Sequence, residues 1–291
     1  MHVHSTSCSH SFAANNRFDP TRTLALRKKY EADMVRRFKR LRAQIPARLE
    51  AVMSSGIRTN ADGFEFTLDG RKIADFMDWL ESTQARELFG VEKGTSISQA
   101  SSRSWQNIYL RSAYQKGVAM AASQMRKGAI EVADRWITAA LTRPIHADRA
   151  GIIYTRAYTA LRGVTQAMDS AISRVLAEGA ALGRGMREIA RGIVDRVDKI
   201  GITRARMIAR TEIINSHAEA SLNSYAEAGL EGVEIQSEFA TAGDNKVCPE
   251  CQELEGKVYS IDDARGVIPV HVQCRCAWLP VVSNPKGIVL K

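Results

Sequence analysis

Apolar residues recur at helical spacing over most of the first 230 positions. In residues 19–56 they lie three or four positions apart, with a few wider gaps, so they share one face of a predicted helix. Pro46 should kink or break this helix near Ile45, because proline has no backbone N–H to donate. Five later blocks repeat the pattern and predict further amphipathic helices: 71–89, 96–141, 148–182, 186–197 and 202–228.

Two short segments alternate between apolar and polar residues, as strands do, and a third segment also predicts a strand. Residues 64–68 end in Asp69-Gly70 and predict a small hairpin or edge strand. Residues 233–240 predict a strand, and residues 277–282 predict a closing edge strand, because an edge tolerates Pro280. The fold class expected is mainly α: an elongated helical body followed by a small α+β C-terminal module.

The same patterns divide the chain into four parts. Residues 1–18 are polar and aperiodic, which indicates a disordered tail. Residues 19–60 form a basic amphipathic helical arm, and residues 61–182 form the helical body. Residues 183–291 form the last domain, which contains a cysteine- and histidine-bearing module from about residue 230.

Positive charge is concentrated in the predicted arm. The chain has a formal net charge of +9, and residues 1–60 hold twelve Lys and Arg against four Asp and Glu. Such a patch favours a polyanion, either nucleic acid or an acidic protein surface, although a solvated helix face has the same composition. The candidate contact residues are Arg27, Lys28, Lys29, Arg36, Arg37, Lys39, Arg40 and Arg42.

The chain shows neither a membrane span nor a secretory signal. No run approaches the roughly 20 apolar residues that a span requires, and residues 1–18 contain no apolar stretch. We therefore expect no membrane association and a reducing cytoplasmic compartment. In that compartment clustered cysteines indicate a metal before they indicate disulfides.

The cysteine cluster has the spacing of a zinc site. Cys248-Pro-Glu-Cys251 can converge on one ion, and after nineteen residues His271-Val-Gln-Cys274-Arg-Cys276 supplies three more candidate ligands. The preferred set is Cys248, Cys251, His271 and Cys274, with Cys276 as a substitute ligand or a neighbouring thiol. Four protein ligands leave no open position, so the zinc is predicted to be structural. Disulfides or free thiols are the alternative.

An enzymatic alternative rests on a different histidine. His217-Ala-Glu219 followed by Cys248-Pro-Glu-Cys251 approaches the H-x-E and P-C-x-x-C signature of zinc deaminases. In that signature proline precedes the first cysteine, whereas here Val247 does. The deaminase hypothesis also leaves His271, Cys274 and Cys276 without a role.

Residues from about 182 to 282 resemble the phage head morphogenesis domain, the family of the Mu F protein and of minor head proteins of other tailed phages. The resemblance is carried by Ile208-Ala-Arg210-Thr211-Glu212, by Asp244-Asn-Lys-Val-Cys248-Pro-Glu-Cys251, and by His271-Val-Gln-Cys274-Arg-Cys276. It covers about a third of the chain. The family usually has proline after the motif histidine, whereas this chain has Val272.

The resemblance implies a non-enzymatic minor head protein. Its implied partners are the portal protein, the major capsid or scaffold protein, and packaged DNA. Its implied location is the host cytoplasm during assembly and then the virion head near the portal, with a role in head assembly and in DNA packaging or ejection. The alternative function is a zinc-containing nucleic-acid-binding protein or deaminase-like enzyme that is not confined to a virion.

Arg210 and Glu212 lie two positions apart on one predicted helix and therefore point in different directions. Arg210 is expected to bind a carboxylate or backbone carbonyl and so hold the helix against the zinc module. The alternative hypothesis is that Arg210 contacts DNA or the portal protein.

Overall fold

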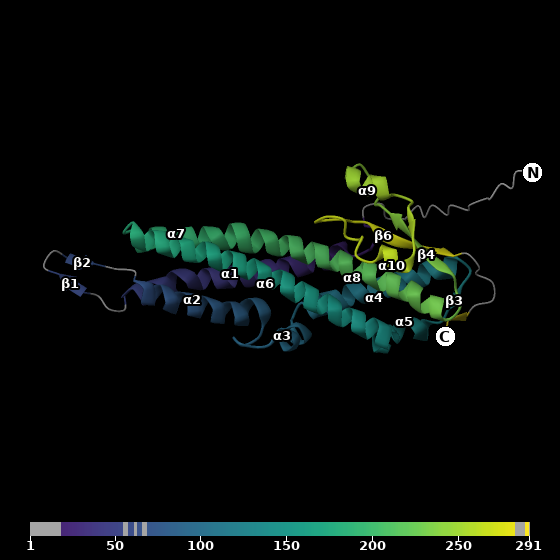
Figure 1. Cartoon of the computed structure of the whole chain (residues 1–291), viewed down its shortest axis with the longest axis horizontal. Coiled ribbons are helices and arrows are strands. Elements are labelled where there is room, and N and C mark those ends of the chain that lie inside the picture. The colour runs from purple at the N-terminus through teal and green to yellow at the C-terminus, as the bar shows by residue number, and fades with distance from the viewer. Residues whose placement is uncertain (1–18, 55–57, 61–62, 66–68, 283–288, 291) are drawn as a thin grey trace, which may run out of the picture.

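The computed structural model of the chain describes residues 19–54, 58–60, 63–65, 69–282 and 289–290. The predicted tail at 1–18 lies outside the described residues, and so do residues 66–68 of the predicted first strand. The molecule is an elongated helical bundle that carries a small mixed module on one side near one end (Figure 1). The expected fold class, mainly α with a small C-terminal sheet, is confirmed.

Four long helices make up most of the bundle. They are α1 (Leu24–Ser54), α4 (Asn107–Lys127), α6 (Pro144–Ala181) and α8 (Thr203–Leu230). Shorter helices complete it: α2 (Gly70–Gln84), α3 (Ile97–Arg103), α5 (Asp134–Thr138) and α7 (Met186–Arg196), with a 3-10 turn at Ala140–Thr142 and π-helical turns at Ala85–Phe89 and Val197–Ile202. None of the described helices is both long and apolar enough to cross a membrane.

The C-terminal module contains a three-stranded antiparallel sheet. Strand β4 (Ile235–Ala240) lies between β5 (Val258–Tyr259) and β6 (Ala277–Val282), and helices α9 (Pro249–Leu254) and α10 (Ile261–Ala264) connect them. Strand β6 is an edge strand, as the sequence predicted. Its Pro280 lies opposite Ser237 of β4. The module covers α8 at this end of the bundle (Figure 1).

Two small strand pairs lie outside this sheet. Strands β1 (Arg58–Asn60) and β2 (Gly63–Glu65) form an antiparallel hairpin at the end of the bundle far from the module (Figure 1). Strands β3 (Glu131–Val132) and β7 (Val289–Leu290) pair in parallel, and the N–H of Ala133 also donates to the carbonyl of Leu290 at 2.9 Å. The chain end is therefore hydrogen-bonded to the helical body, which the sequence pattern did not indicate.

Helix α1 is part of the bundle core. It continues through Pro46 to Ser54, so the predicted break near Ile45 is wrong. Apolar side chains that include Phe38, Leu41 and Leu49 are fully buried where α1 packs against α2, α7 and α8. This packing holds the helix although Pro46 cannot donate a backbone hydrogen bond, and it places residues 24–54 inside the bundle.

Two other boundaries differ from the sequence prediction. The block 96–141, predicted as one helix, is divided by a turn at 104–106 and by β3. Asp69 does not close a hairpin: its side chain accepts the N–H of Lys72 at 2.8 Å and caps α2, which begins at Gly70. Asp is a favoured helix cap as well as a turn residue, and only the following helix distinguishes the two uses.

The closest approach of two long helices occurs where α4 crosses α8. A Cβ atom added to Gly117 of α4 would lie 2.4 Å from the carbonyl oxygen of His217 and 2.7 Å from the Cβ atom of Ala220 on α8. Both neighbours are fixed by the helix backbone, so neither can move aside.

The predicted domain boundary at 182 falls between α6 and α7, while α8 beyond it packs against α1, α4 and α6.

We expect Gly117→Ala to lower the free energy of unfolding by about 1–3 kcal/mol, because overpacking outweighs the better helix propensity of alanine. Gly163→Ala in α6 is the matched control, since a Cβ atom there meets nothing within 4 Å. That control should raise stability by roughly 0.5–1 kcal/mol. Urea unfolding of both variants measures the difference, and equal midpoints would contradict the packing argument.

Candidate metal centre

The first two cysteines are fixed by the start of α9. Cys248 has an extended backbone conformation and caps the helix: its sulfur accepts the N–H of Cys251 at 3.4 Å. Pro249 occupies the first turn, where its missing N–H costs nothing. The C-x-x-C spacing thereby places both sulfur atoms at the N-terminus of one short helix.

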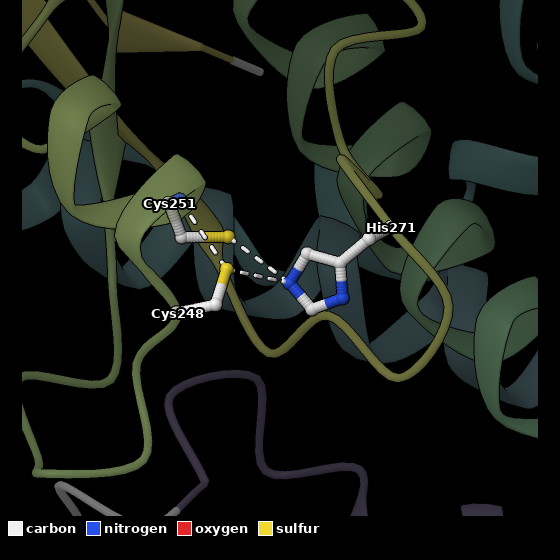
Figure 2. Close-up of side chains that lie close together, drawn as sticks. All are labelled: Cys248, Cys251 and His271. Carbon is white, nitrogen blue, oxygen red and sulfur yellow. Dashed lines mark hydrogen bonds between the residues drawn. The ribbon is translucent and has the colours of Figure 1, made fainter.

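His271 completes a first group of three. Its Nε2 lies 3.1 Å from the sulfur of Cys248 and 3.3 Å from that of Cys251 (Figure 2). On the other side of the ring, Nδ1 donates to the carbonyl oxygen of Val272 at 2.7 Å. This hydrogen bond leaves Nε2 unprotonated in the neutral ring and directs it at the two thiols, as in histidines that bind metals.

Cys274 and Cys276 form a second group with Cys251. The sulfur atoms of these three residues lie within 4.8 Å of one another, and all three residues are buried. The N–H of Cys274 bonds to the carbonyl of His271 at 3.1 Å, and Gln273 between them has a left-handed φ of 69°. The turn brings both cysteines to the side of α9, as expected for residues two positions apart. Cys251 belongs to both groups and joins them.

The donor set suits zinc. The four described cysteines are free, so the disulfide alternative is not formed among them. The thiol of Cys276 bonds to Cys274 and lowers the pKa of Cys274, whereas burial raises the pKa of Cys251. Thiols and one imidazole crowded in this way share protons that a zinc ion would replace. Five donors for four positions leave open which of His271 and Cys276 completes the set.

Charged side chains attach this centre to the bundle. The guanidinium of Arg275 binds both carboxylate oxygens of Asp244, at 2.8 Å and 2.6 Å, within the C-terminal module. Arg210 of α8 donates to Glu31 of α1 at 2.8 Å and to the side-chain oxygen of Gln273 at 3.0 Å. The loop that carries the ligands is thus bonded directly to α8 and through it to α1.

Comparison with known proteins finds a similarity in this region. Residues 170–279 match the model of a family described as Phage Mu protein F like protein. This part of the chain is similar to that family. No curated protein and no solved structure matches the chain. The matched range begins within α6, includes α7 and α8, and ends within β6.

The signature residues of the Mu F-like segment face different parts of the molecule. Arg210 faces α1 and the ligand loop, whereas the buried Glu212 lies 3.3 Å from the Nε atom of Arg156 on α6. The different directions expected for these two side chains are confirmed. Burial raises the pKa of Glu212, and the hydroxyl of Thr211 between them has no hydrogen-bond partner in the described structure.

The deaminase-like pair does not meet the cysteines. His217 is buried in the middle of α8, neither ring nitrogen has a hydrogen-bond partner among the described residues, and burial lowers its pKa to about 4. Glu219 pairs with Arg265 at 3.1 Å and with Arg149 at 3.5 Å. The His/Cys groups close enough to share an ion, within the described chain, contain His271 and not His217.

Most predicted arm residues have partners inside the molecule. Arg27 is buried and bonded to Asp19 at 3.0 Å, which is at odds with a contact to a partner. The other arginines pair as follows: Arg36 with Asp33, Arg40 with Glu87, Arg42 with Asp198, and Arg37 with the Glu87 carbonyl and the Trp105 ring. Lys28, Lys29 and Lys39 are exposed, and no ion pair of theirs occurs in the described part of the chain.

The Asp244–Arg275 pair predicts a pH dependence. The guanidinium of Arg275 lowers the pKa of Asp244 from 3.8 to about 2. A folded-state pKa below the unfolded one adds stability above about pH 4 that is lost as the pH falls towards 2. Arg275→Gln should therefore raise the titration midpoint of the Asp244 carboxyl carbon towards 3.8 and remove this part of the acid sensitivity.

Carbon-13 NMR of the side-chain carboxyl measures the midpoint. Arg265→Gln is the matched control, because Arg265 lies in the same module and pairs with Glu219 instead. The control should leave the Asp244 midpoint near 2. An unchanged midpoint in Arg275→Gln would contradict the assigned cause.

Proposed function

We propose that the protein is a phage minor head protein that associates with the portal and acts in head assembly and in DNA packaging or ejection. The match of residues 170–279 to the Mu F-like family carries this proposal. The contacts of Arg210 and Arg275 add support, because motif residues at distant positions in the chain bind the ligand loop and its neighbours together. The proposed location is the virion head near the portal.

A structural role without catalysis fits the chemistry of the site. We propose one zinc ion bound by Cys248, Cys251 and Cys274 with His271 or Cys276 as the fourth ligand. Four protein ligands leave no position for substrate water. The module's strands are short, and a bound ion would hold its two ligand-bearing segments together where the hydrophobic core is small.

The exposed lysines of α1 are the proposed contact with a portal, scaffold or DNA surface. Lys28, Lys29 and Lys39 lie on the helix that forms much of the predicted basic arm, and they carry charge that no described acidic group neutralises. Of the eight residues predicted, these three have no ion pair in the described part of the chain, whereas the five arginines have partners within the protein. A contact of this kind depends on salt, because counterions are released or screened.

Purified reduced protein should contain about one zinc per chain by elemental analysis. Cys251→Ser should abolish stoichiometric zinc and lower thermal stability, because Cys251 belongs to both groups of ligands. Cys8→Ser removes the fifth cysteine and should retain the ion. A folded, reduced wild-type sample without metal would exclude the zinc proposal, and so would equal zinc content in both variants.

Quantitative mass spectrometry of purified heads tests the head assignment. Wild-type protein should be present in heads and cross-link to the portal protein. Changing Lys28, Lys29 and Lys39 to Gln should lower incorporation about tenfold, since three exposed charge contacts of roughly 0.5 kcal/mol each give that factor. The matched control changes the exposed Lys116, Lys246 and Lys257 to Gln and should incorporate normally.

Two outcomes would count against the proposal. Absence of the protein from heads would favour the alternative of a zinc-containing nucleic-acid-binding protein outside the virion. Normal incorporation of the α1 variant would show that the three lysines are not the contact.

A further inference from the structure

A pocket of about 670 Å³ lies between α2, α6 and the segment 90–97, remote in sequence from the metal centre. Lining residues follow one face of α2 and one face of α6 at helical intervals. Part of the wall is apolar: Phe89 and Tyr158 contribute rings whose centroids are 5.0 Å apart, and Met77 also lines the space. The volume is in the range of pockets that accept a small ligand or a partner's side chain.

Asp169 of α6 lies in this pocket without a compensating cation. Its Oδ1 accepts a hydrogen bond of 2.5 Å from the side-chain amide of the buried Gln84. Burial raises the pKa of Asp169 to about 6, and the neighbouring charge that adds to the rise is Glu81, another acid. A carboxylate removed from water in this way is stabilised when a cation binds beside it.

The basic residues of the pocket are engaged or distant. Lys93 bonds to Asp78 at 2.5 Å and to Glu81 at 2.9 Å, so it neutralises acids at α2. Arg162 lies seven residues from Asp169 on α6, which corresponds to about 10 Å along the helix. The lining contains four acidic residues against these two bases, and the pocket therefore has a surplus of negative charge.

We propose that this pocket binds a lysine or arginine side chain of a partner protein. The ammonium or guanidinium group would pair with Asp169, and its methylene stem would lie against Met77, Phe89 and Tyr158. Charge complementarity selects the cation, and the apolar wall selects a cation on an aliphatic stem over a small ion. The inference is independent of the head function and of zinc, since no residue of the metal centre lines the pocket.

NMR titration with N-acetyl-lysine methylamide tests this site in the full chain. The probe should shift amide signals of the residues that line the pocket. At ten times its dissociation constant it should lower the Asp169 titration midpoint by about one pH unit, because it binds the ionised form. The neutral isostere N-acetyl-norleucine methylamide should bind at least tenfold more weakly.

Asp169→Asn should weaken binding of the lysine probe at least tenfold. This variant should fold, because the amide removes a charge that is costly to bury. The matched control is Asp75→Asn, an exposed acid on α2 that does not line the pocket, and it should bind the probe as the wild type does.

Three results would overturn the proposal. Equal binding of the norleucine and lysine probes would show an apolar pocket without cation recognition. Unchanged affinity in Asp169→Asn would show that the carboxylate has no part in binding. Cadaverine binding at least tenfold more tightly than the lysine probe would assign the pocket to a free diamine and not to a side chain of a partner protein.

Discussion

The burial of α8 is the constraint on which the rest of the structure depends. From Glu212 to Tyr225 every side chain of this helix is buried, the polar ones included. A helix in this position needs neighbours on all sides, and α1, α4, α6 and the C-terminal sheet supply them. Several of its polar residues have partners within the protein: Ser216 donates to the Leu110 carbonyl at 2.7 Å, and Asn223 donates to the Tyr114 hydroxyl at 2.9 Å. The ring nitrogens of His217, by contrast, have no hydrogen-bond partner among the described residues.

The position of the metal centre follows from the same helix. Arg210 projects from α8 two residues before the fully buried stretch and reaches both Glu31 and Gln273, so the ligand loop contacts the bundle at a defined point. Arg275, between two candidate ligands, binds both carboxylate oxygens of Asp244. Ion pairs fix the orientation of the loop, while the cysteines and histidine provide the donor atoms.

Local patterns predicted the elements better than their arrangement. The side chains of Cys248, Cys251 and His271, predicted as candidate ligands, lie close together, and Pro280 lies on an edge strand. The sequence could not predict that α1 continues through Pro46, because that depends on packing against helices distant in sequence. The pairing of β3 with β7 and the pocket at Asp169 were missed for the same reason: their residues meet only in the folded chain.

The basic arm shows how tertiary contacts change the meaning of a sequence pattern. Counting charge along the chain gave one strongly cationic segment, but Arg40 and Arg42 meet Glu87 and Asp198 of other helices, and Arg27 meets Asp19 inside the protein. Arginine, with its planar donors, is used for these internal pairs, whereas the exposed lysines remain available to solvent. A segment that looks like one binding surface therefore contains two kinds of basic residue: arginines with partners within the protein, and exposed lysines that have no ion pair in the described part of the chain.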